Sequence, residues 1–370
     1  MVRAVRILHL ADRLSARGGA DWHLMGVLRA QVRDLPPGSV QLAAGRSDGT
    51  VEPPCEVEVV GLLGAREEER DDPLHALLAR ARPDLLHLHN IVNPRVLEWA
   101  AGAPLPALAT VQDHRFFCPG RGKWTLGGDR CHEPLRRARC ASCFTDAGYF
   151  EAIYDVTRRR LRALGELDAL TVLSSYMKRE LVDAGVPARR IHVIPPFVHG
   201  LGPVGATGPP CVLFVGRLVA AKGPKDALEV WRRSGLASKL PLVLAGTGSV
   251  RQALERRAGP GVELPGWVPH EALGALYRRA RIVLLPCRWQ EPFGIVGLEA
   301  LSLGAPVAAW ESGGVGEWHP GPLPPWGDLD GLAAEAARLS AEAGPVSVPS
   351  GFEEGELMSR LGRLYQELLR

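Results

Sequence analysis

Two glutamates lie within a stretch that is otherwise almost free of charge, QEPFGIVGLEALSLGAPVAAW, which covers residues 290–310. No charged residue separates Glu291 from Glu299. Carboxylates in such apolar surroundings are seldom buried without partners. The residue types alone leave three chemistries open for this pair: an acid–base pair, a metal site, or acceptors for hydroxyl groups.

The segments around the two glutamates predict where they lie in a fold. The run RIVLLPC (281–287) predicts a buried strand, and IVGLEALSLG (295–304) predicts a helix that begins near Gly294. A helix start carries unpaired N–H groups and a partial positive charge, and glycine lets a ligand approach the backbone closely. Glu299 would lie roughly 7 Å along the helix axis from that start. We therefore expect the two acids to flank an anion of the phosphate type and to accept hydrogen bonds from hydroxyls.

Two cations follow another apolar run, in VLFVGRLVAAKG (212–223). Arg217 offers a planar fork of donors and Lys222 a point charge, and together they suit a diphosphate. A basic pair at the end of a strand is more often only solvated, so this pair carries little weight by itself.

Short apolar runs alternate with amphipathic helical stretches along all 370 residues. This order predicts an α/β fold with two Rossmann-like, doubly wound domains of parallel strands, in which ligands bind beyond the carboxyl ends of the strands. Residues 197–210, rich in proline and glycine, separate a first domain (1–196) from a second (211–350) as a linker. The last helix, 351–370, is expected to pack back on the first domain.

The composition excludes several classes of protein. A formal net charge of +3 is too near neutral for a nucleic-acid binder, and 46% hydrophobic with 23% charged residues is typical of a globular enzyme. No apolar run approaches the ~20 residues that a membrane-spanning helix needs, and the charged N-terminal stretch lacks the apolar core of a secretory signal. We expect a cytoplasmic protein with reduced thiols.

Five segments of the second domain together resemble a known family. They are GRLVAAKG, GTGSVRQ, PGWVPHEALGALYRRA, EPFGIVGLEALSLGAPV and SGGVGE, and their order and spacing resemble the GT-B glycosyltransferases of the retaining class called family 4. The first domain is similar more loosely, through GGAD (18–21), DLLHLHN, and SSYMKREL with RIHVIPPFV. The resemblance implies that the two domains face each other across a cleft, and that the two glutamates are the family's signature pair.

The resemblance implies roles for individual residues. Glu291 would contact hydroxyls of the donor sugar, while Arg217 and Lys222 would hold the diphosphate. The donor-binding set would comprise Gly18, Gly19, Trp267, Val268, Phe293, Gly294, Ile295 and Glu299, with the base near Trp267 and Val268 and the ribose on Glu299. The implied mechanism retains configuration and needs no enzymatic nucleophile, no metal and no other cofactor, because the leaving phosphate takes the acceptor's proton. UDP is the favoured nucleotide because it is common in the family, and GDP and ADP stay open.

The first domain departs from the family pattern at TVQDHRFFCP (110–119). Relatives commonly have Thr-x-His-Asp there, whereas this chain has Gln112, which can hydrogen-bond but cannot titrate. Asp113 and His114 are therefore the candidates on the acceptor side. One alternative is a catalytically impaired sugar-nucleotide-binding subunit, and another is the same fold acting on a nucleophile other than an alcohol. The acceptor stays open among saccharides, lipid-linked molecules and small molecules.

Four of the seven cysteines lie in a Gly- and Arg-rich loop, 114–148: Cys118, Cys131, Cys140 and Cys143. In a reducing compartment such a set favours metal ligation over disulfides. Structural zinc suits four thiolates, an iron–sulfur cluster is also open, and four unligated cysteines are the alternative. The remaining three, Cys55, Cys211 and Cys287, are expected to be small core residues.

Basic and histidine residues of the first domain need an interpretation as well. RRAR (136–139) and TRRRLR (157–162), interleaved with aromatics, could contact an anionic membrane or an anionic acceptor, but we favour a solvated helix face. Nucleic-acid binding by the cysteine loop is a rival that the low net charge argues against. His87 and His89 share one face of a strand and are expected to be structural. Asp328 is expected to cap a helix.

Overall fold

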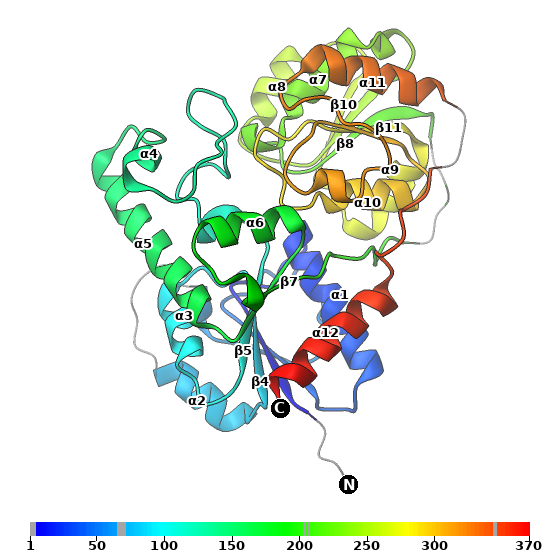
Figure 1. Ribbon diagram of the computed structural model, residues 1–370. Coiled ribbons are helices and arrows are strands. Elements are labelled where there is room, and N and C mark those ends of the chain that lie inside the picture. The colour runs from blue at the N-terminus through cyan, green and yellow to red at the C-terminus, as the bar shows by residue number, and fades with distance from the viewer. Residues whose placement is uncertain (1–4, 65–71, 203–204, 206–207, 343–345) are drawn as a thin grey trace. The chain divides into compact units, whose positions relative to one another are not determined.

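The computed structural model describes residues 5–64, 72–202, 205, 208–342 and 346–370, and it divides into two compact units (Figure 1). The first unit holds Met1–Leu126, Cys131–Pro196 and Glu354–Arg370, and the second holds Gly127–Arg130 and Phe197–Glu353. Part of the predicted linker, residues 203–204 and 206–207, lies outside the described residues. So do residues 343–345, near the predicted end of the second domain, and residues 1–4 of the N-terminal stretch.

A seven-stranded parallel sheet forms the centre of the first unit. Its strands are β1 (Ile7–Ala11), β2 (Val40–Ala44), β3 (Val57–Val59), β4 (Leu85–His89), β5 (Ala107–Val111), β6 (Ala169–Val172) and β7 (Ile191–Val193). They lie in the order β3-β2-β1-β4-β5-β6-β7, and β1, β4 and β5 are buried along their whole length. Strands of parallel sheets that helices cover on both faces read as such continuous apolar runs. The strand order reverses between β1 and β4.

The helices of the first unit are α1 (Gly19–Asp34), α2 (Asp72–Ala81), α3 (Pro94–Ala101), α4 (Arg137–Ala141), α5 (Ala147–Glu166), α6 (Ser175–Asp183) and α12 (Glu354–Leu368). Side chains cap several of them: Asn93 accepts from the N–H of Arg95 at the start of α3, and Ser174 accepts from the N–H of Met177 at the start of α6. Each such cap satisfies one of the N–H groups that a helix start leaves unpaired.

The C-terminal helix α12 belongs to the first unit, and Figure 1 shows it beside α1. Leu357, Leu361 and Leu364 are buried on its inner face. At its start, Glu354 forms an ion pair with Arg33 of α1, with 2.7 Å between nitrogen and oxygen. Helix α12 therefore packs on the first unit and is tied to α1 by an ion pair.

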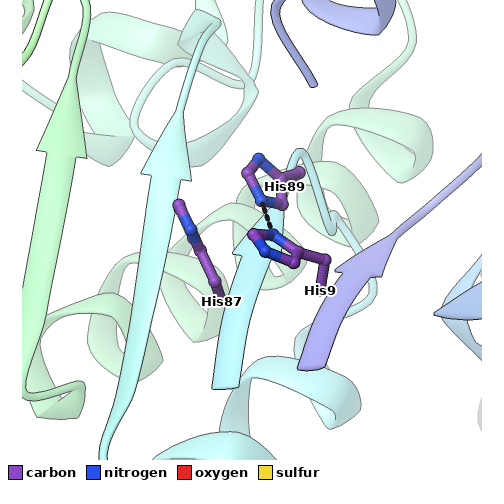
Figure 2. Close-up of side chains that lie close together, drawn as sticks. All are labelled: His9, His87 and His89. Carbon is purple, nitrogen blue, oxygen red and sulfur yellow. Dashed lines mark hydrogen bonds between the residues drawn. The ribbon is translucent and has the colours of Figure 1, made fainter. Parts of the chain in front are cut away.

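Three histidines on the two central strands form a buried polar network (Figure 2). His9 on β1 and His89 on β4 lie 2.9 Å apart between Nδ1 and Nε2. His9 Nε2 donates to Gln31 Oε1 at 2.7 Å, and His87 Nδ1 lies 2.7 Å from the Tyr365 hydroxyl of α12. Gln31 Nε2 donates to the same hydroxyl at 3.1 Å. Burial lowers the pKa of all three histidines, that of His9 to about 4, so the rings are neutral.

One nitrogen of each of these histidines lies within 4.8 Å of the others, which is close enough to consider a metal. The rings of His87 and His89, however, lie against each other, with their centroids 3.9 Å apart and their planes tilted by 35°. An ion would also have to displace the direct hydrogen bond between His9 and His89. We therefore interpret the network as structural, joining the centre of the sheet to α1 and α12.

The second unit contains a five-stranded parallel sheet in the order β10-β9-β8-β11-β12. The strands are β8 (Cys211–Val215), β9 (Leu242–Ala245), β10 (Val262–Gly266), β11 (Ala280–Leu285) and β12 (Val307–Ala309), and the helices are α7 (Pro224–Arg233), α8 (Arg251–Arg257), α9 (His270–Arg279), α10 (Ile295–Ser302) and α11 (Leu329–Ala341). Asp328 caps α11, as predicted, by accepting from the N–H of Gly331 at 2.9 Å. The predicted fold class, α/β with two Rossmann-like doubly wound domains, is confirmed. The order of the second sheet reverses between β8 and β11, and ligands bind such sheets at this switch point.

Candidate active site at the switch point of the second unit

The loops that follow β8 and β11 touch each other at the switch point. The backbone N–H of Arg288 donates to the carbonyl of Ala221 at 2.9 Å. Gly223 makes this contact possible, because its φ is +70° and a Cβ there would lie 1.8 Å from the carbonyl oxygen of Pro286. The contact brings Lys222, in one loop, against the residues of the other.

Glu291 is buried, and donors from both loops bind its carboxylate. Lys222 Nζ and Trp289 Nε1 each lie 2.7 Å from Glu291 Oε2, and Cys287 Sγ lies 3.1 Å from the same oxygen. Burial acts to raise the pKa of Glu291, but the charge and hydrogen bond of Lys222, with the other two donors, lower it below its ordinary value. Glu291 is thus an ionised carboxylate that can only accept hydrogen bonds.

Glu299 is also buried, but its surroundings are less polar. Tyr277 on α9 donates its hydroxyl to Glu299 Oε2 at 2.7 Å, and His270 Nε2 lies 3.9 Å from Oε1. Burial raises the pKa of Glu299 to about 7, with the Tyr277 hydrogen bond acting in the opposite direction. Near neutral pH the two glutamates therefore differ in charge.

The start of α10 lies between the two glutamates in the chain. Gly294 precedes the helix with a left-handed φ of +88°, and no side chain among the described residues caps it. Phe293 is buried and its carbonyl accepts from Trp318 Nε1, while Ile295 is half-buried. Packing thus fixes the helix start, and its N–H groups and positive dipole end follow Glu291 after the short turn Pro292–Gly294.

Three further predicted donor-binding residues follow strands of the same sheet. Arg217, after β8, is exposed, and its guanidinium has no hydrogen bond or ion pair to any residue that the structure describes. Trp267, after β10, is 46% exposed, and Val268 is half-buried. A cation and an aromatic face are therefore available to a ligand beyond the carboxyl ends of these strands.

The predicted acceptor-side residues follow β5 in the first unit. Asp113 accepts from the N–H of Arg115 at 2.8 Å and from its Nε at 2.7 Å. Burial acts to raise the pKa of Asp113, but Arg115 lowers it, so this carboxylate is ionised. His114 is buried, and its Nε2 lies 3.0 Å from the Tyr176 hydroxyl. Both residues thus have partners within the protein.

An imidazole that the sequence analysis missed lies beside the departure from the family pattern. His23 Nδ1 lies 2.9 Å from Gln112 Nε2. His23 is on α1, which begins at Gly19 after Gly18. Its position one turn beyond these two glycines was the available signal, because such residues face the same way on a helix.

Sequence reasoning also missed Cys287, Trp289 and Tyr277, which touch the two glutamates. Cys287 and Cys211 are buried, as predicted, and Cys55 is half-buried. The burial of Cys287 gave no hint that its thiol would meet Glu291. These contacts depend on how loops pack, which a motif does not encode.

The four cysteines of the loop approach one another without forming a close set. All are half-buried and none is in a disulfide. Burial raises the pKa of Cys140 and Cys143, and the thiols of Cys118 and Cys131 add to the rise. A Cβ on Gly120 would lie 3.9 Å from Sγ of both Cys118 and Cys143. In the described part of the chain, no three of these thiols come within 4.8 Å of one another, so the set would have to tighten around an ion.

Several arginines of the two basic segments are engaged within the first unit. Arg160 is buried and donates to the carbonyl of Val92, while Arg159 pairs with Glu98 at 2.8 Å. Arg137 likewise forms an ion pair, and Arg136 and Arg139 are exposed. No helix in the described ranges has both the length and the apolar character to span a bilayer.

Comparison with known proteins gives consistent matches. The profile of Glycosyltransferase Family 4 matches residues 4–199, and that of Glycosyl transferases group 1 matches residues 204–318. Glycogen synthase from Mycobacterium tuberculosis is 37% identical over 117 residues, which are 30% of this chain and 28% of that protein. D-inositol 3-phosphate glycosyltransferase from Nocardia farcinica is 32% identical over 247 residues, 57% of this chain and 53% of that protein. The chain thus spans about half or less of the length of these relatives. The crystal structure of Anabaena Alr3699/HepE with UDP and glucose shares the fold, with a TM-score of 0.66, 15% identity, and coverage of 98% of this chain and 99% of that one.

Proposed function

The chain belongs to glycosyltransferase family 4, and from this premise we propose that it moves a sugar from a nucleotide diphosphate sugar to an acceptor. The observation that carries the proposal is the switch point of the second unit. There an ionised Glu291, bound to Lys222, lies one short turn before an uncapped helix start. An anionic diphosphate with hydroxyl-bearing groups at both ends matches these three features.

In this proposal each residue of the second unit binds one part of the donor. Arg217, Lys222 and the N–H groups of α10 hold the diphosphate and stabilise its charge as it leaves. Glu291 accepts hydrogen bonds from the sugar and Glu299 from the ribose. The base stacks on the exposed face of Trp267.

We propose that the transfer retains configuration. The departing phosphate takes the proton of the acceptor, which attacks from the same face, so the protein supplies orientation and charge rather than a nucleophile. No metal is needed for this step. UDP is the favoured nucleotide, and the structural similarity to a protein solved with UDP and glucose supports that choice.

The Gln112–His23 pair favours an active enzyme over an impaired binding subunit. The position where relatives have histidine holds Gln112, but an imidazole from α1 lies 2.9 Å away. The first unit therefore still carries a group that can exchange a proton or bind a hydroxyl near this position. Asp113, paired with Arg115, then helps to fix the loop around it.

The test begins with ligand binding by the whole chain. UDP, GDP and ADP, and their glucose or mannose conjugates, are compared by thermal shift, since a ligand at about 100 times its dissociation constant adds ~2.7 kcal/mol of stability. We expect one nucleotide series to stabilise the protein. Arg217→Ala should weaken that binding by about tenfold or more, because it removes a charged contact to phosphate. Arg233→Ala, which removes an α7 arginine paired with Asp330, is the matched control and should not.

Stereochemistry is tested on the same material. Slow hydrolysis of the best-binding sugar nucleotide, followed by proton NMR, should first release the sugar with the donor's own anomeric configuration. Release of the opposite anomer would contradict retention. Stabilisation by none of the nucleotides would overturn the proposed function.

We further propose that the cysteine loop holds a structural metal, zinc or an iron–sulfur cluster. Four half-buried thiols lie in one loop, where Cys118 and Cys131 add to the raised pKa of Cys140 and Cys143, and a long loop with little apolar content needs a staple. Elemental analysis and the visible spectrum of anaerobically purified protein should show one zinc or a cluster. Cys143→Ser should reduce the metal content and Cys55→Ser should not. A metal-free wild-type protein with an intact fold would end this proposal.

A further inference from the structure

The two carboxylate oxygens of Glu291 have different surroundings. Its three side-chain donors, Lys222, Trp289 and Cys287, all bind one oxygen, Oε2. No residue that the structure describes donates to Oε1. We propose that Trp289 and Cys287 are positioning residues that hold the Glu291 carboxylate so that Oε1 receives hydroxyls of the donor sugar. The proposal rests on the proposed function, since it assigns the residues that shape the sugar end of that site.

The backbone of Glu291 is fixed independently of its side chain. Its N–H donates to Ser312 Oγ at 3.1 Å, and its carbonyl accepts from the N–H of Gly314 at 2.8 Å. Ser312 Oγ in turn donates to the carbonyl of Trp289 at 3.0 Å. With the main chain held by residues 312–314, the remaining freedom of Glu291 is rotation of its side chain, and the three donors on Oε2 remove that freedom.

Trp289 contacts both charged partners of this site. Its indole N–H donates to Glu291, and its ring lies under the Lys222 ammonium, with 4.4 Å between Nζ and the ring centroid. A cation over an aromatic face is attracted by the ring's negative charge distribution. Trp289 therefore keeps Lys222 beside the carboxylate while leaving the other protons of the ammonium for phosphate.

Cys287 is suited to be a donor rather than a nucleophile. It is buried in the loop after β11, next to Pro286, and burial, followed by the negative charge of Glu291, raises the pKa of its thiol well above the ordinary value. The thiol therefore keeps its proton and can donate it to Oε2. A serine at this position would keep a donor of similar size, whereas an alanine would not.

The experiment separates binding of the sugar from binding of the nucleotide. Affinities of the whole chain for UDP and for UDP-glucose are measured by calorimetry, or for GDP and GDP-mannose if that pair binds better. The readout is the ratio of the two dissociation constants, which isolates the contribution of the sugar. Trp289→Phe keeps an aromatic ring beside Lys222 and loses the N–H. Trp231→Phe is the matched control, because that indole donates to the carbonyl of Leu240 instead.

Trp289→Phe should weaken binding of the sugar nucleotide by about tenfold, as expected for loss of one hydrogen bond to a charged group, and change nucleotide affinity less than twofold. Cys287→Ala should weaken binding of the sugar nucleotide about threefold, and Cys287→Ser should keep the wild-type ratio of the two dissociation constants. The Trp231→Phe control should leave the ratio unchanged.

Two results would overturn the proposal while leaving the proposed function in place. In one, nucleotide binding persists and Trp289→Phe does not change the ratio. In the other, Trp289→Phe weakens nucleotide and sugar nucleotide equally, which would assign Trp289 to the fold of the loop alone. If neither nucleotide pair binds the wild-type chain, the proposed function fails and this assignment with it.

Discussion

Nucleotide binding is expected to strengthen as the pH rises from 6 to 8, and Glu299 is the reason. In the protein without ligand, burial raises the pKa of this carboxyl to about 7. Under the proposed function, Glu299 accepts hydrogen bonds from the ribose hydroxyls, and such bonds favour its ionised form. The group must therefore lose its proton when the nucleotide binds, and below pH 7 that loss opposes binding.

The size of the effect follows from the pKa. One proton released per ligand changes the dissociation constant tenfold per pH unit, or about 1.4 kcal/mol, at pH values well below 7. Between pH 8, where Glu299 is mostly ionised, and pH 6, where it is mostly protonated, we expect affinity to fall roughly tenfold. Glu299 also makes the stability of the unliganded protein depend on pH. Because its folded pKa is raised, its contribution to stability is present below pH 4.5 and is lost as the pH rises through about 7.

The assay is calorimetry at pH 6, 7 and 8 at fixed ionic strength, with the wild type and Glu299→Gln in parallel. Subtracting the variant's profile removes the titration of the nucleotide's own phosphate. In buffers of different ionisation enthalpy, the wild type should release close to one proton at pH 6 and the variant close to none. Glu311→Gln, a change to an exposed acid, should reproduce the wild-type profile. Tyr277→Phe should move the transition to higher pH, because it removes a donor that favours the ionised form.

The reasoning is refuted if the wild type and Glu299→Gln show the same slope. It is also refuted if affinity stays constant while turnover falls above pH 7. That outcome would mean that the protonated carboxyl acts as a general acid, which is what a carboxyl of raised pKa beside an ionised one can do.

Three other outcomes are expected. Tyr365→Phe removes a hydroxyl that hydrogen-bonds both His87 and Gln31, so the free energy of unfolding of the first unit, measured in urea, should fall by about 2–4 kcal/mol. Tyr149→Phe, at an exposed site, should leave that free energy unchanged. The buried histidines are neutral with lowered pKa values, so stability should fall as the pH drops from about 6.5 towards 4, by about 1.4 kcal/mol per histidine at pH 5.5. A flat urea midpoint over that range would contradict this. Gly223→Ala should weaken nucleotide binding, because its Cβ would strike the carbonyl of Pro286 and displace the Lys222 loop; unchanged affinity would show that the loop contact is not needed.

The sequence predicts the sheets well because buried parallel strands are continuous apolar runs. Leu85–His89 lies within a segment that the apolar run predicts as a strand, and Ala280–Leu285 begins one residue before the predicted segment 281–287. The short strand Val57–Val59 was not predicted, since it lies at the edge of its sheet, is half-buried or exposed, and alternates with a charge. The length and polarity of an edge strand give little signal.

The environments of the site residues could not be predicted, because they depend on contacts between segments far apart in the chain. His114 was an acceptor-side candidate by its position after Asp113, but it is buried against Tyr176, which is 62 residues away. His23 and Gln112 are 89 residues apart in the chain and 2.9 Å apart in space. A motif identifies residue types at strand ends, whereas burial and partners decide which of those residues face a ligand.

The two glutamates that drew attention in the sequence show the same principle within one site. Both are buried carboxylates, and their residue type cannot distinguish them. Glu291 meets a cation and two further donors and becomes a fixed anion, whereas Glu299 meets one tyrosine hydroxyl and stays near its titration point. An anion that is fixed before the ligand arrives needs no proton exchange to bind a sugar. A carboxyl that ionises only as the ligand binds makes nucleotide affinity sensitive to pH. The number of hydrogen-bond donors around each carboxylate, rather than the spacing between the two glutamates, therefore decides which of them titrates near neutral pH.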